Sequence, residues 1–333
     1  MVYVDTFACC EYVAALDCFK SKPPNPPRTP LYELRNIVGK GIGMVATHPI
    51  QAGALIYRER PIHATRRTLL VLGDQLDNGV FFRAALQRLT PEARNSILEL
   101  QNSATEDGYD KIRGIMKTNC LEIRITELPD TKAGEEFRAC FPTLSRINHA
   151  CSPTANYYFN WKTFQGEVRA LHEIVEGEEI TIAYTDLCRP KRERHAKLRE
   201  ERFMTTCICR ICEQPPHLID ESDARRVKIH ALLSQMLPVG SKGMPENIPI
   251  ARFREAMDAA EEEGVIYDFS KLLLFGSQLL TIYGNLDEAK EWASRARRLF
   301  RESEGKDGYH YAGLEQAMKI HAQMEASGQG PIA

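Results

Sequence analysis

Long apolar runs are missing from this sequence. No stretch approaches the roughly 20 apolar residues that a helix needs to cross a bilayer, so we expect no membrane span. An excess of charge of one sign is also missing, because 43 Lys and Arg stand against 45 Asp and Glu. The resulting net charge of -2 excludes a global field that would draw the protein to nucleic acid or to an anionic membrane.

The N-terminus lacks the basic region that opens a secretory signal, and Asp5 and Glu11 interrupt its apolar residues. We therefore expect the protein in the cytosol or the nucleus. Its ten cysteines should then be reduced thiols, for which metal binding is a better explanation than a disulfide framework. None of these cysteines falls between residues 64 and 110.

The first third of the chain changes character twice. Residues 21–30 read SKPPNPPRTP, which predicts an extended linker, because proline can continue neither a helix nor a central strand. Strand-like segments with glycine turns follow. From residue 64 to 110 apolar residues recur at helical spacing, and Thr90-Pro91-Glu92 predicts an N-cap and a first turn.

Strand character returns between residues 119 and 184, and everything beyond about residue 216 predicts helix. The clearest helices form a pair that meets at Gly284-Asn285, in the manner of a tetratricopeptide hairpin. We find no second copy at the same period. A small helical domain packed on the rest of the chain and a peptide-binding groove are both open interpretations.

Three cysteines, Cys207, Cys209 and Cys212, form a C-x-C-x-x-C cluster in which three thiolates can converge on one ion. A structural zinc site normally takes four ligands, so a fourth must come from elsewhere in the chain. Spacing alone does not choose among the candidates, which are Cys9, Cys10, Cys18, Cys120, Cys140, Cys151 and Cys188. The alternative is that the three are unrelated buried thiols.

A second motif, Asn148-His149-Ala150-Cys151, carries little weight alone, because a lone histidine is more often structural than catalytic. Its weight comes from order along the chain. A glycine-rich turn lies near residue 40, this motif near 150, Gly-Glu-Glu-Ile-Thr-Ile-Ala-Tyr at 177–184, and C-x-C-x-x-C near 210.

This order resembles the SET-domain methyltransferases, and among them the SET-and-MYND branch and its fungal relatives, over roughly residues 31–215. The resemblance implies an α+β fold: a knotted, β-rich SET domain with a helical insert, a post-SET zinc site and a helical C-terminal domain. The implied boundaries are an N-terminal segment and linker at 1–30, a SET domain at 31–190 with its insert at about 64–110, a post-SET segment at 191–215 and the helical domain at 216–333.

The resemblance also implies roles for single residues. Cys151 matches the fourth ligand of a structural zinc ion. The residues expected to contact S-adenosylmethionine are Lys40, Gly41, Asn119, Asn148, His149, Tyr184 and Phe203.

Methyl transfer from a sulfonium is an in-line displacement, so the enzyme must position and desolvate more than it must do acid–base work. The attacking lysine must be neutral, although its ordinary pKa is about 10.4, and a narrow apolar channel lowers that pKa by disfavouring the charged form. Tyr184, at the end of its strand, is our candidate for aligning the amine with the methyl group. We expect that Tyr157, Tyr158 and Phe159 could line the channel.

Three departures from the family pattern stand out. Thr154 occupies the place of an asparagine, which puts one loop contact in doubt. The absence of cysteine from residues 64–110 means that a helical insert stands where the MYND zinc module would be. Thr205 occupies the place of an aromatic that lies against the cofactor, and Phe203, two residues earlier, is the expected substitute.

Three functions compete on this evidence. The leading hypothesis is an S-adenosylmethionine-dependent protein-lysine methyltransferase that acts as a monomer on a lysine-bearing protein or peptide, with no direct nucleic-acid or membrane partner. The second is a SET-like scaffold that has lost methyl transfer and serves as a binding module or in another reaction. The third is a zinc-stabilised interaction protein that works through its C-terminal helices.

Overall fold

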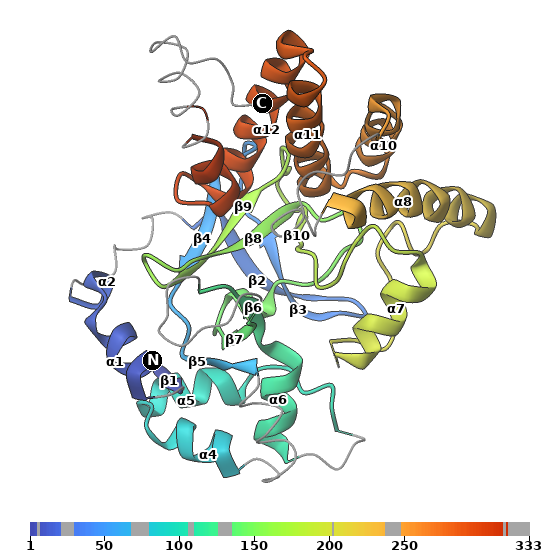
Figure 1. The fold of residues 1–333 in the computed structure, drawn as a ribbon. Helices are drawn as coiled ribbons and strands as arrows, with labels where there is room; N and C mark the ends of the chain where they lie inside the picture. Colours follow the sequence, from blue (N-terminus) through green and yellow to red (C-terminus); the bar gives the residue numbers. More distant parts are fainter. Residues whose placement is uncertain are drawn as a thin grey trace.

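Strands form the middle of the molecule and helices cover both ends (Figure 1). The structure is a computed structural model that describes residues 1–4, 7–20, 30–67, 80–105, 110–125, 135–201, 203–236, 248–315 and 318. Residues 21–29 of the proline-rich segment expected at 21–30, and residues 68–79 of the region expected to be helical, lie outside these residues. The α+β class expected from the sequence is confirmed.

The first sheet holds the glycine-rich hairpin. Its strands are β2 (Tyr32–Ile37), β3 (Gly41–Ala46) and β10 (Glu179–Ile180), in the order β10-β3-β2, with antiparallel neighbours. The turn between β2 and β3 uses Gly39 and Gly41 at φ 76° and 77°, a region that other residues rarely adopt. The hairpin tip is thereby placed beside the site described below.

Two further sheets complete the strand layer. One has the order β4-β9-β8, with β4 (Leu55–Glu59), β8 (Ala155–Asn160) and β9 (Gln165–Ala170). The other has the order β1-β5-β7-β6, with β1 (Val2–Val4), β5 (His63–Arg66), β6 (Leu121–Ile123) and β7 (Phe137–Cys140). The pairing of β1 with β5 is parallel, and the sequence patterns did not predict this N-terminal strand.

One apolar core lies between the sheets. Phe137, Phe141 and Phe164 are fully buried there, together with aliphatic residues from most of the strands. Burying a side chain of this size contributes about 1.5–3 kcal/mol relative to leaving it in water. The core therefore holds in place the strand ends from which the site is built.

Helices α4 (Val80–Gln87), α5 (Pro91–Leu98) and α6 (Lys111–Asn119) pack at one end of the sheets, near α1 (Phe7–Ala15) and α2 (Asp17–Lys20) (Figure 1). The expected cap is confirmed, because the Thr90 hydroxyl accepts from the amide of Ala93 at 3.3 Å and Pro91 opens α5. Helix α6 runs to Asn119, so the strand expected from residue 119 begins only at Leu121.

The other end is helical. It comprises α7 (Lys191–Glu200), α8 (Pro216–Met236), α10 (Ile250–Glu263), α11 (Ile266–Ile282) and α12 (Leu286–Glu304). Helix α10 packs on α8 and α11, and α11 packs on α12, which also rests on β8 and β9. The helical pair expected at Gly284-Asn285 is confirmed as α11 and α12. Leu187 and Cys188, just beyond Tyr184, belong to this helical core.

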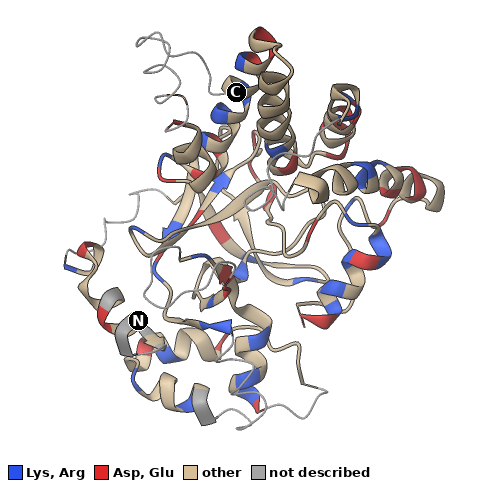
Figure 2. Ribbon diagram, viewed as in Figure 1, with Lys and Arg blue, Asp and Glu red and all other residues tan. Residues whose placement is uncertain are grey.

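Charges are mixed rather than segregated. In Figure 2 basic and acidic segments alternate along α7, in keeping with its sequence KRERHAKLRE. Among the described residues, no helix combines the length and the apolar character needed to cross a membrane.

Candidate active site

A cavity lies between the β2–β3 hairpin tip, the end of α6 and the segment at 203–208. All seven residues expected to contact a cofactor line it: Lys40, Gly41, Asn119, Asn148, His149, Tyr184 and Phe203. Residues that the sequence patterns did not single out also contribute, among them Gln101, Ser145 and Arg146. The structure therefore brings together motifs that lie up to about 160 positions apart in the chain.

Glycine at position 43 lets strand β3 lie close to the side chain of Asn148. A Cβ on Gly43 would lie 2.7 Å from Nδ2 of Asn148, so only glycine lets the asparagine amide rest against β3. Gly41 has the opposite surroundings, because nothing lies within 4 Å of a Cβ built there. The backbone at Gly41 is thus open toward the cavity, and its positive φ still disfavours a side chain.

Glu179 organises the polar wall of the cavity. Its Oε2 lies 2.6 Å from Nζ of Lys40, and its Oε1 accepts from Nδ2 of Asn148 at 2.9 Å. The Lys40 and Glu179 side chains are 19% and 18% exposed, so their ion pair is only partly screened by solvent. Sequence analysis missed this role, although Glu179 stands inside the Gly-Glu-Glu-Ile motif.

Asn119 closes α6 at the cavity wall. Its Nδ2 donates to the carbonyls of Gln101 at 2.6 Å and Ile115 at 2.7 Å, which joins the end of α6 to the segment at Gln101. Its own carbonyl accepts from the Ser145 hydroxyl at 2.8 Å. The amide nitrogen is therefore engaged within the protein, and the residue fixes the meeting point of α6 and the helical turn η1 (Leu144–Arg146).

Two segments distant in sequence run side by side at the centre of the site. The Ile182 amide donates to the carbonyl of Asn148 at 3.0 Å, and the Ala150 amide donates to the carbonyl of Ile182 at 3.2 Å. His149 and Ile182 form the resulting parallel bridge. Residues 181–184 were expected to continue a strand, but regular pairing of β10 ends at Ile180 because the chain turns to meet this segment.

His149 connects the tyrosine to the cysteines. The Tyr184 amide donates to its Nδ1 at 3.1 Å, so in the neutral ring the proton is on Nε2. Nε2 lies 3.4 Å from Sγ of Cys151 and can donate to that sulfur. Burial lowers the pKa of His149 to about 4, which keeps the ring neutral near pH 7.

Tyr184 lies between two rings. Its ring centroid is 5.0 Å from that of Phe203 and 5.5 Å from that of His149. Its hydroxyl donates to the carbonyl of Ile147, which leaves the oxygen lone pairs for another donor. Burial raises the pKa of Tyr184 well above its ordinary value, so the hydroxyl stays protonated at neutral pH.

A second cavity meets the first at Tyr184 and Phe203, which line both. Leu121, Tyr157 and Ile182 contribute further wall, and charged residues of α7 and β7 surround it. Of the three aromatic residues expected to line a channel, Tyr157 is at this cavity. The Tyr158 hydroxyl instead donates to the carbonyl of Asp307 at 3.2 Å, and Phe159 packs on Phe164 in the core.

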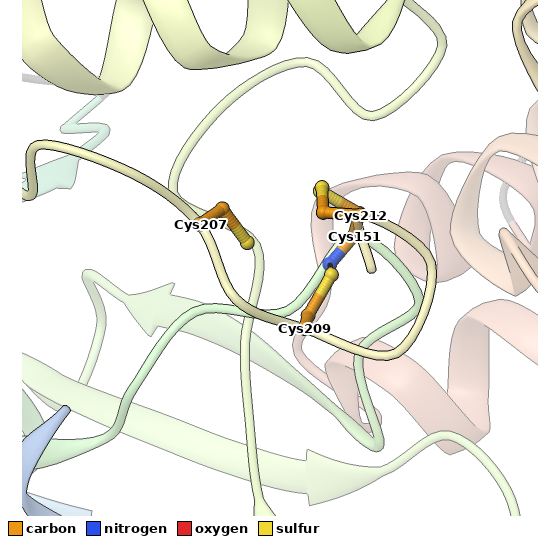
Figure 3. Close-up of side chains that lie close together, drawn as sticks. All are labelled: Cys151, Cys207, Cys209 and Cys212. Atoms are coloured by element: carbon orange, nitrogen blue, oxygen red, sulfur yellow. Dashed lines mark hydrogen bonds between the residues drawn. The ribbon is translucent and has the colours of Figure 1, made fainter. Parts of the chain in front are cut away.

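Four cysteines converge next to the first cavity (Figure 3). The sulfurs of Cys151, Cys207, Cys209 and Cys212 all lie within 4.8 Å of one another, and the side chains are buried. Sγ of Cys151 is 3.6 Å from Sγ of Cys212. Two of the other candidates for the fourth ligand, Cys120 and Cys140, belong to a separate cluster near α4 and α6. The four-cysteine cluster brings the C-x-C-x-x-C segment onto the Asn148–Cys151 motif.

Basic side chains lie beside this cluster. Burial would lower the pKa of Arg194, but the charges and hydrogen bonds of Cys151 and Cys212 outweigh burial and raise it. Nε2 of His195 lies 3.3 Å from Sγ of Cys212, and Nζ of Lys191 donates to the Cys212 carbonyl at 2.7 Å. Thiolates in this cysteine cluster would therefore have positive charge next to them.

Two of the three departures from the family pattern, at Thr154 and Thr205, have local explanations. The Thr154 hydroxyl accepts from the Thr181 amide at 2.9 Å, and its own amide donates to the Thr181 hydroxyl at 3.2 Å, so a loop contact exists without asparagine. Thr205 is exposed, whereas Phe203 lines both cavities. Phe203 thus occupies the aromatic position beside Tyr184.

Glu59 anchors the helical turn that enters the site. Its Oε1 accepts from the amides of Thr143 at 2.8 Å and Leu144 at 2.6 Å, directly ahead of Ser145 and Arg146. Burial raises the pKa of Glu59 from 4.5 to about 7, against the lowering effect of these two bonds.

Comparison with known proteins finds similarity over the region that carries the site. The model of the SET domain matches residues 41–185. The histone-lysine N-methyltransferase set5 of Schizosaccharomyces pombe is 28% identical over 295 residues, which cover 86% of this chain and 83% of that protein. The N-lysine methyltransferase SMYD2-B of Xenopus laevis is 39% identical over 138 residues, but these span only 39% of this chain and 31% of that relative.

Likeness to solved structures is weaker. The S-adenosylmethionine-bound ctPRC2 in an autoinhibited conformation is similar over 87% of this chain and 33% of that chain, with 13% identity and a TM-score of 0.27. The sequence matches therefore carry the comparison, and they confirm the resemblance expected from the four motifs.

The raised pKa of Glu59 predicts a pH dependence of stability. Between pH of about 4.5 and about 7 the folded protein binds more protons than the unfolded chain, so the free energy of unfolding falls as pH rises. The full shift of the Glu59 pKa corresponds to a decrease of roughly 3 kcal/mol in the free energy of unfolding. Glu59→Gln should remove this decline. Urea unfolding of the variant and of the wild type at pH 5 and pH 8 measures the change in the free energy of unfolding between the two pH values.

Glu176 is exposed, so Glu176→Gln is the matched control and should keep the wild-type pH dependence of the free energy of unfolding. Equal pH dependence in Glu59→Gln and wild type would show that Glu59 is ionised throughout this range.

Proposed function

We propose that this chain, a member of the SET-domain family, transfers methyl groups from S-adenosylmethionine to lysine side chains of proteins. The observation that carries the proposal is the pair of cavities that meet at Tyr184 and Phe203. A methyl transferase needs a donor and an acceptor approaching from opposite sides of one point, and these two residues form such a point. Relatives named as lysine methyltransferases support the choice of acceptor.

The first cavity suits the methyl donor. S-adenosylmethionine, when bound, supplies an electrophilic methyl group on a sulfonium. The open backbone at Gly41 and the Lys40–Glu179–Asn148 polar row offer hydrogen-bonding groups for its polar portions.

The second cavity suits the lysine. Leu121, Tyr157 and Phe203 present apolar surface that disfavours a charged amine and so lowers its pKa toward neutrality. The Tyr184 hydroxyl, whose proton points to the Ile147 carbonyl, accepts a hydrogen bond from the amine. The nucleophile is thereby oriented, and surrounding protein replaces water around it.

The four cysteines fit a structural zinc ion. Tetrahedral coordination at about 2.3 Å from each sulfur places sulfurs roughly 3.8 Å apart. The 3.6 Å separation of Cys151 and Cys212 agrees with this value. Zinc here would tie the segment at 203–208, which walls the first cavity, to the motif that contains Asn148 and His149.

The remaining assignments belong to the same proposal. We place the SET domain at 31–190 with its insert at about 64–110, the post-SET segment at 191–215 and the helical domain at 216–333. A monomer acting in the cytosol or the nucleus on protein substrates is the simplest form of this function. The scaffold alternative loses its main support, since Phe203 lines both cavities close to the position of Thr205, and the Thr154 hydroxyl makes a loop contact without asparagine.

Zinc removal is predicted to weaken the donor site. Cys209→Ser should reduce bound zinc from one equivalent per chain to a small fraction and loosen the wall formed by residues 203–208. Zinc content by mass spectrometry and calorimetric binding of S-adenosylhomocysteine measure the two effects. Cys18→Ser is the control, because Cys18 lies outside the cluster. A full zinc equivalent in Cys209→Ser would remove these cysteines from the metal site.

Tyr184→Phe tests the chemical role. The change keeps the ring between Phe203 and His149 but removes the oxygen that aligns the amine, so turnover should fall by roughly 10²-fold or more. Incorporation of labelled methyl into protein lysine measures turnover, and binding of S-adenosylhomocysteine should be unchanged.

Tyr283→Phe serves as the matched control, because that hydroxyl bonds the Ile248 carbonyl in the helical region. Wild-type turnover in Tyr184→Phe would exclude Tyr184 from the reaction.

A further inference from the structure

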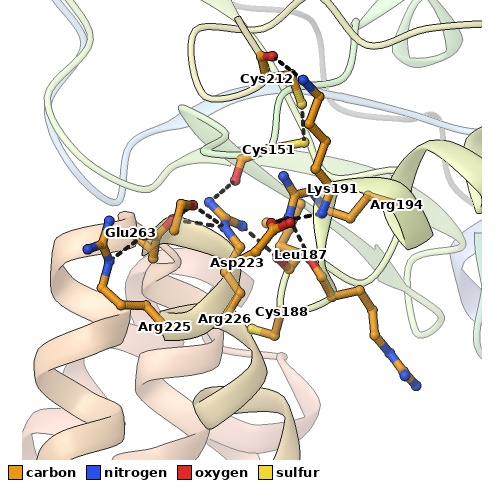
Figure 4. Close-up of polar contacts among 12 residues, drawn as sticks. Cys151, Leu187, Cys188, Lys191, Arg194, Cys212, Asp223, Arg225, Arg226 and Glu263 are labelled. Atoms are coloured by element: carbon orange, nitrogen blue, oxygen red, sulfur yellow. Dashed lines mark hydrogen bonds and ion pairs between the residues drawn. The ribbon is translucent and has the colours of Figure 1, made fainter. Parts of the chain in front are cut away.

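A buried arginine of the helical region reaches into the active-site segments. Arg226 lies on α8 and its side chain is 0% exposed (Figure 4). Its Nη2 donates to the carbonyl of Cys151 at 2.9 Å and its Nη1 to the carbonyl of Leu187 at 2.5 Å. One guanidinium thus bonds two stretches of chain that are 36 positions apart.

The charge of Arg226 is matched within the helices. Its Nε donates to Oε2 of Glu263 at 2.8 Å and lies 3.3 Å from the Ser222 hydroxyl. Glu263, on α10, is itself 2% exposed, so the pair is fully desolvated. Breaking such a pair on one side leaves a buried charge without its counterion, which is costly. The guanidinium is therefore held at a fixed position by α8 and α10.

The two carbonyls belong to the segments that carry the site. Cys151 follows His149 by two residues, and Leu187 follows Tyr184 by three. These are the segments paired through the bridge of His149 and Ile182. Arg226 bonds both of them just beyond that bridge, where each leaves the site for the cysteine cluster or the helical core.

A second contact of α8 strengthens this arrangement. Asp223 accepts from the Lys191 amide at 2.8 Å and pairs with Arg194 at 3.4 Å, so it fixes the start of α7 (Figure 4). Nζ of Lys191 in turn donates to the carbonyl of Cys212. One face of α8 therefore contacts the Cys151 segment directly and is linked to the Cys212 segment through Lys191.

We infer that Arg226 is a positioning residue: from the helical region it holds the Asn148–Cys151 and Tyr184–Leu187 segments in fixed relation. The consequence for methyl transfer rests on the proposed function, because the first segment lines the donor cavity and the second supplies Tyr184. The C-terminal helices are then part of the catalytic apparatus, and a partner or substitution that shifts α8 changes the site.

The chain offers a matched pair of variants. Arg226→Lys retains a charge for Glu263, but a lysine ammonium cannot reproduce the planar fork that reaches both carbonyls. Arg225→Met is the control: Arg225 is the next residue on α8 and also bonds Glu263, at 2.6 Å, while its other ion pair goes to Glu262. If Arg226→Lys fails to fold, Arg226→Met with Glu263→Met removes both buried charges and is measured in its place.

Hydrogen exchange with mass spectrometry tests the inference without any ligand. In Arg226→Lys, exchange should become roughly tenfold faster in peptides covering residues 147–151 and 182–188, while peptides of α12 and β9 keep wild-type rates. Arg225→Met should leave all of these peptides unchanged. Equal exchange in the two variants, or acceleration spread evenly over the whole chain, would overturn the positioning role.

Calorimetry with S-adenosylhomocysteine then measures the consequence. Arg226→Lys should bind roughly tenfold more weakly than Arg225→Met, with zinc content equal in both. Unchanged affinity would confine Arg226 to the protein scaffold and contradict its role in the site. If the wild type does not bind at all, the proposed function is wrong, and the exchange data still decide whether Arg226 orders the two segments.

Discussion

The pairing of the Asn148–Ala150 segment with Ile182 is the interaction on which the rest of the site depends. Two backbone hydrogen bonds hold the segments together, although they lie more than 30 positions apart in the chain. From this pairing Asn148 reaches Glu179 of β10, Cys151 enters the cysteine cluster and Tyr184 lies between the two cavities. Further bonds come from Cys209, whose sulfur accepts from the Cys151 amide, and from Arg226 of α8, which donates to the carbonyls of Cys151 and Leu187.

Electrostatics in the site follow from burial. His149 is neutral and Tyr184 protonated because burial shifts each pKa away from the charged form. Neither residue is suited to strong acid–base work, which agrees with a displacement that requires alignment and desolvation. Two charged pairs at the site are partly or fully buried, Lys40 with Glu179 and Arg226 with Glu263.

Much of the site could be predicted because its motifs are local and their order along the chain is distinctive. The C-x-C-x-x-C spacing identified three ligands, but Cys151 came only from the family resemblance, since spacing says nothing about contacts across 56 positions. Glu179 and Arg226 were missed because a charged residue in a polar stretch or a helix looks the same whether it faces solvent or the site. The strand expected through Tyr184 was too long, because tertiary pairing with Asn148 draws residues 181–184 away from β10.

The central claim is that the cavity beside Tyr184 receives S-adenosylmethionine. Calorimetric titration of the zinc-loaded wild-type protein with S-adenosylmethionine, repeated with Asn148→Ala, tests it most directly. The account predicts one site per chain with micromolar affinity in the wild type and strong weakening in the variant, which loses the amide bonded to Glu179. Absence of binding to well-folded, zinc-loaded wild-type protein, or equal affinity in the variant, would contradict it.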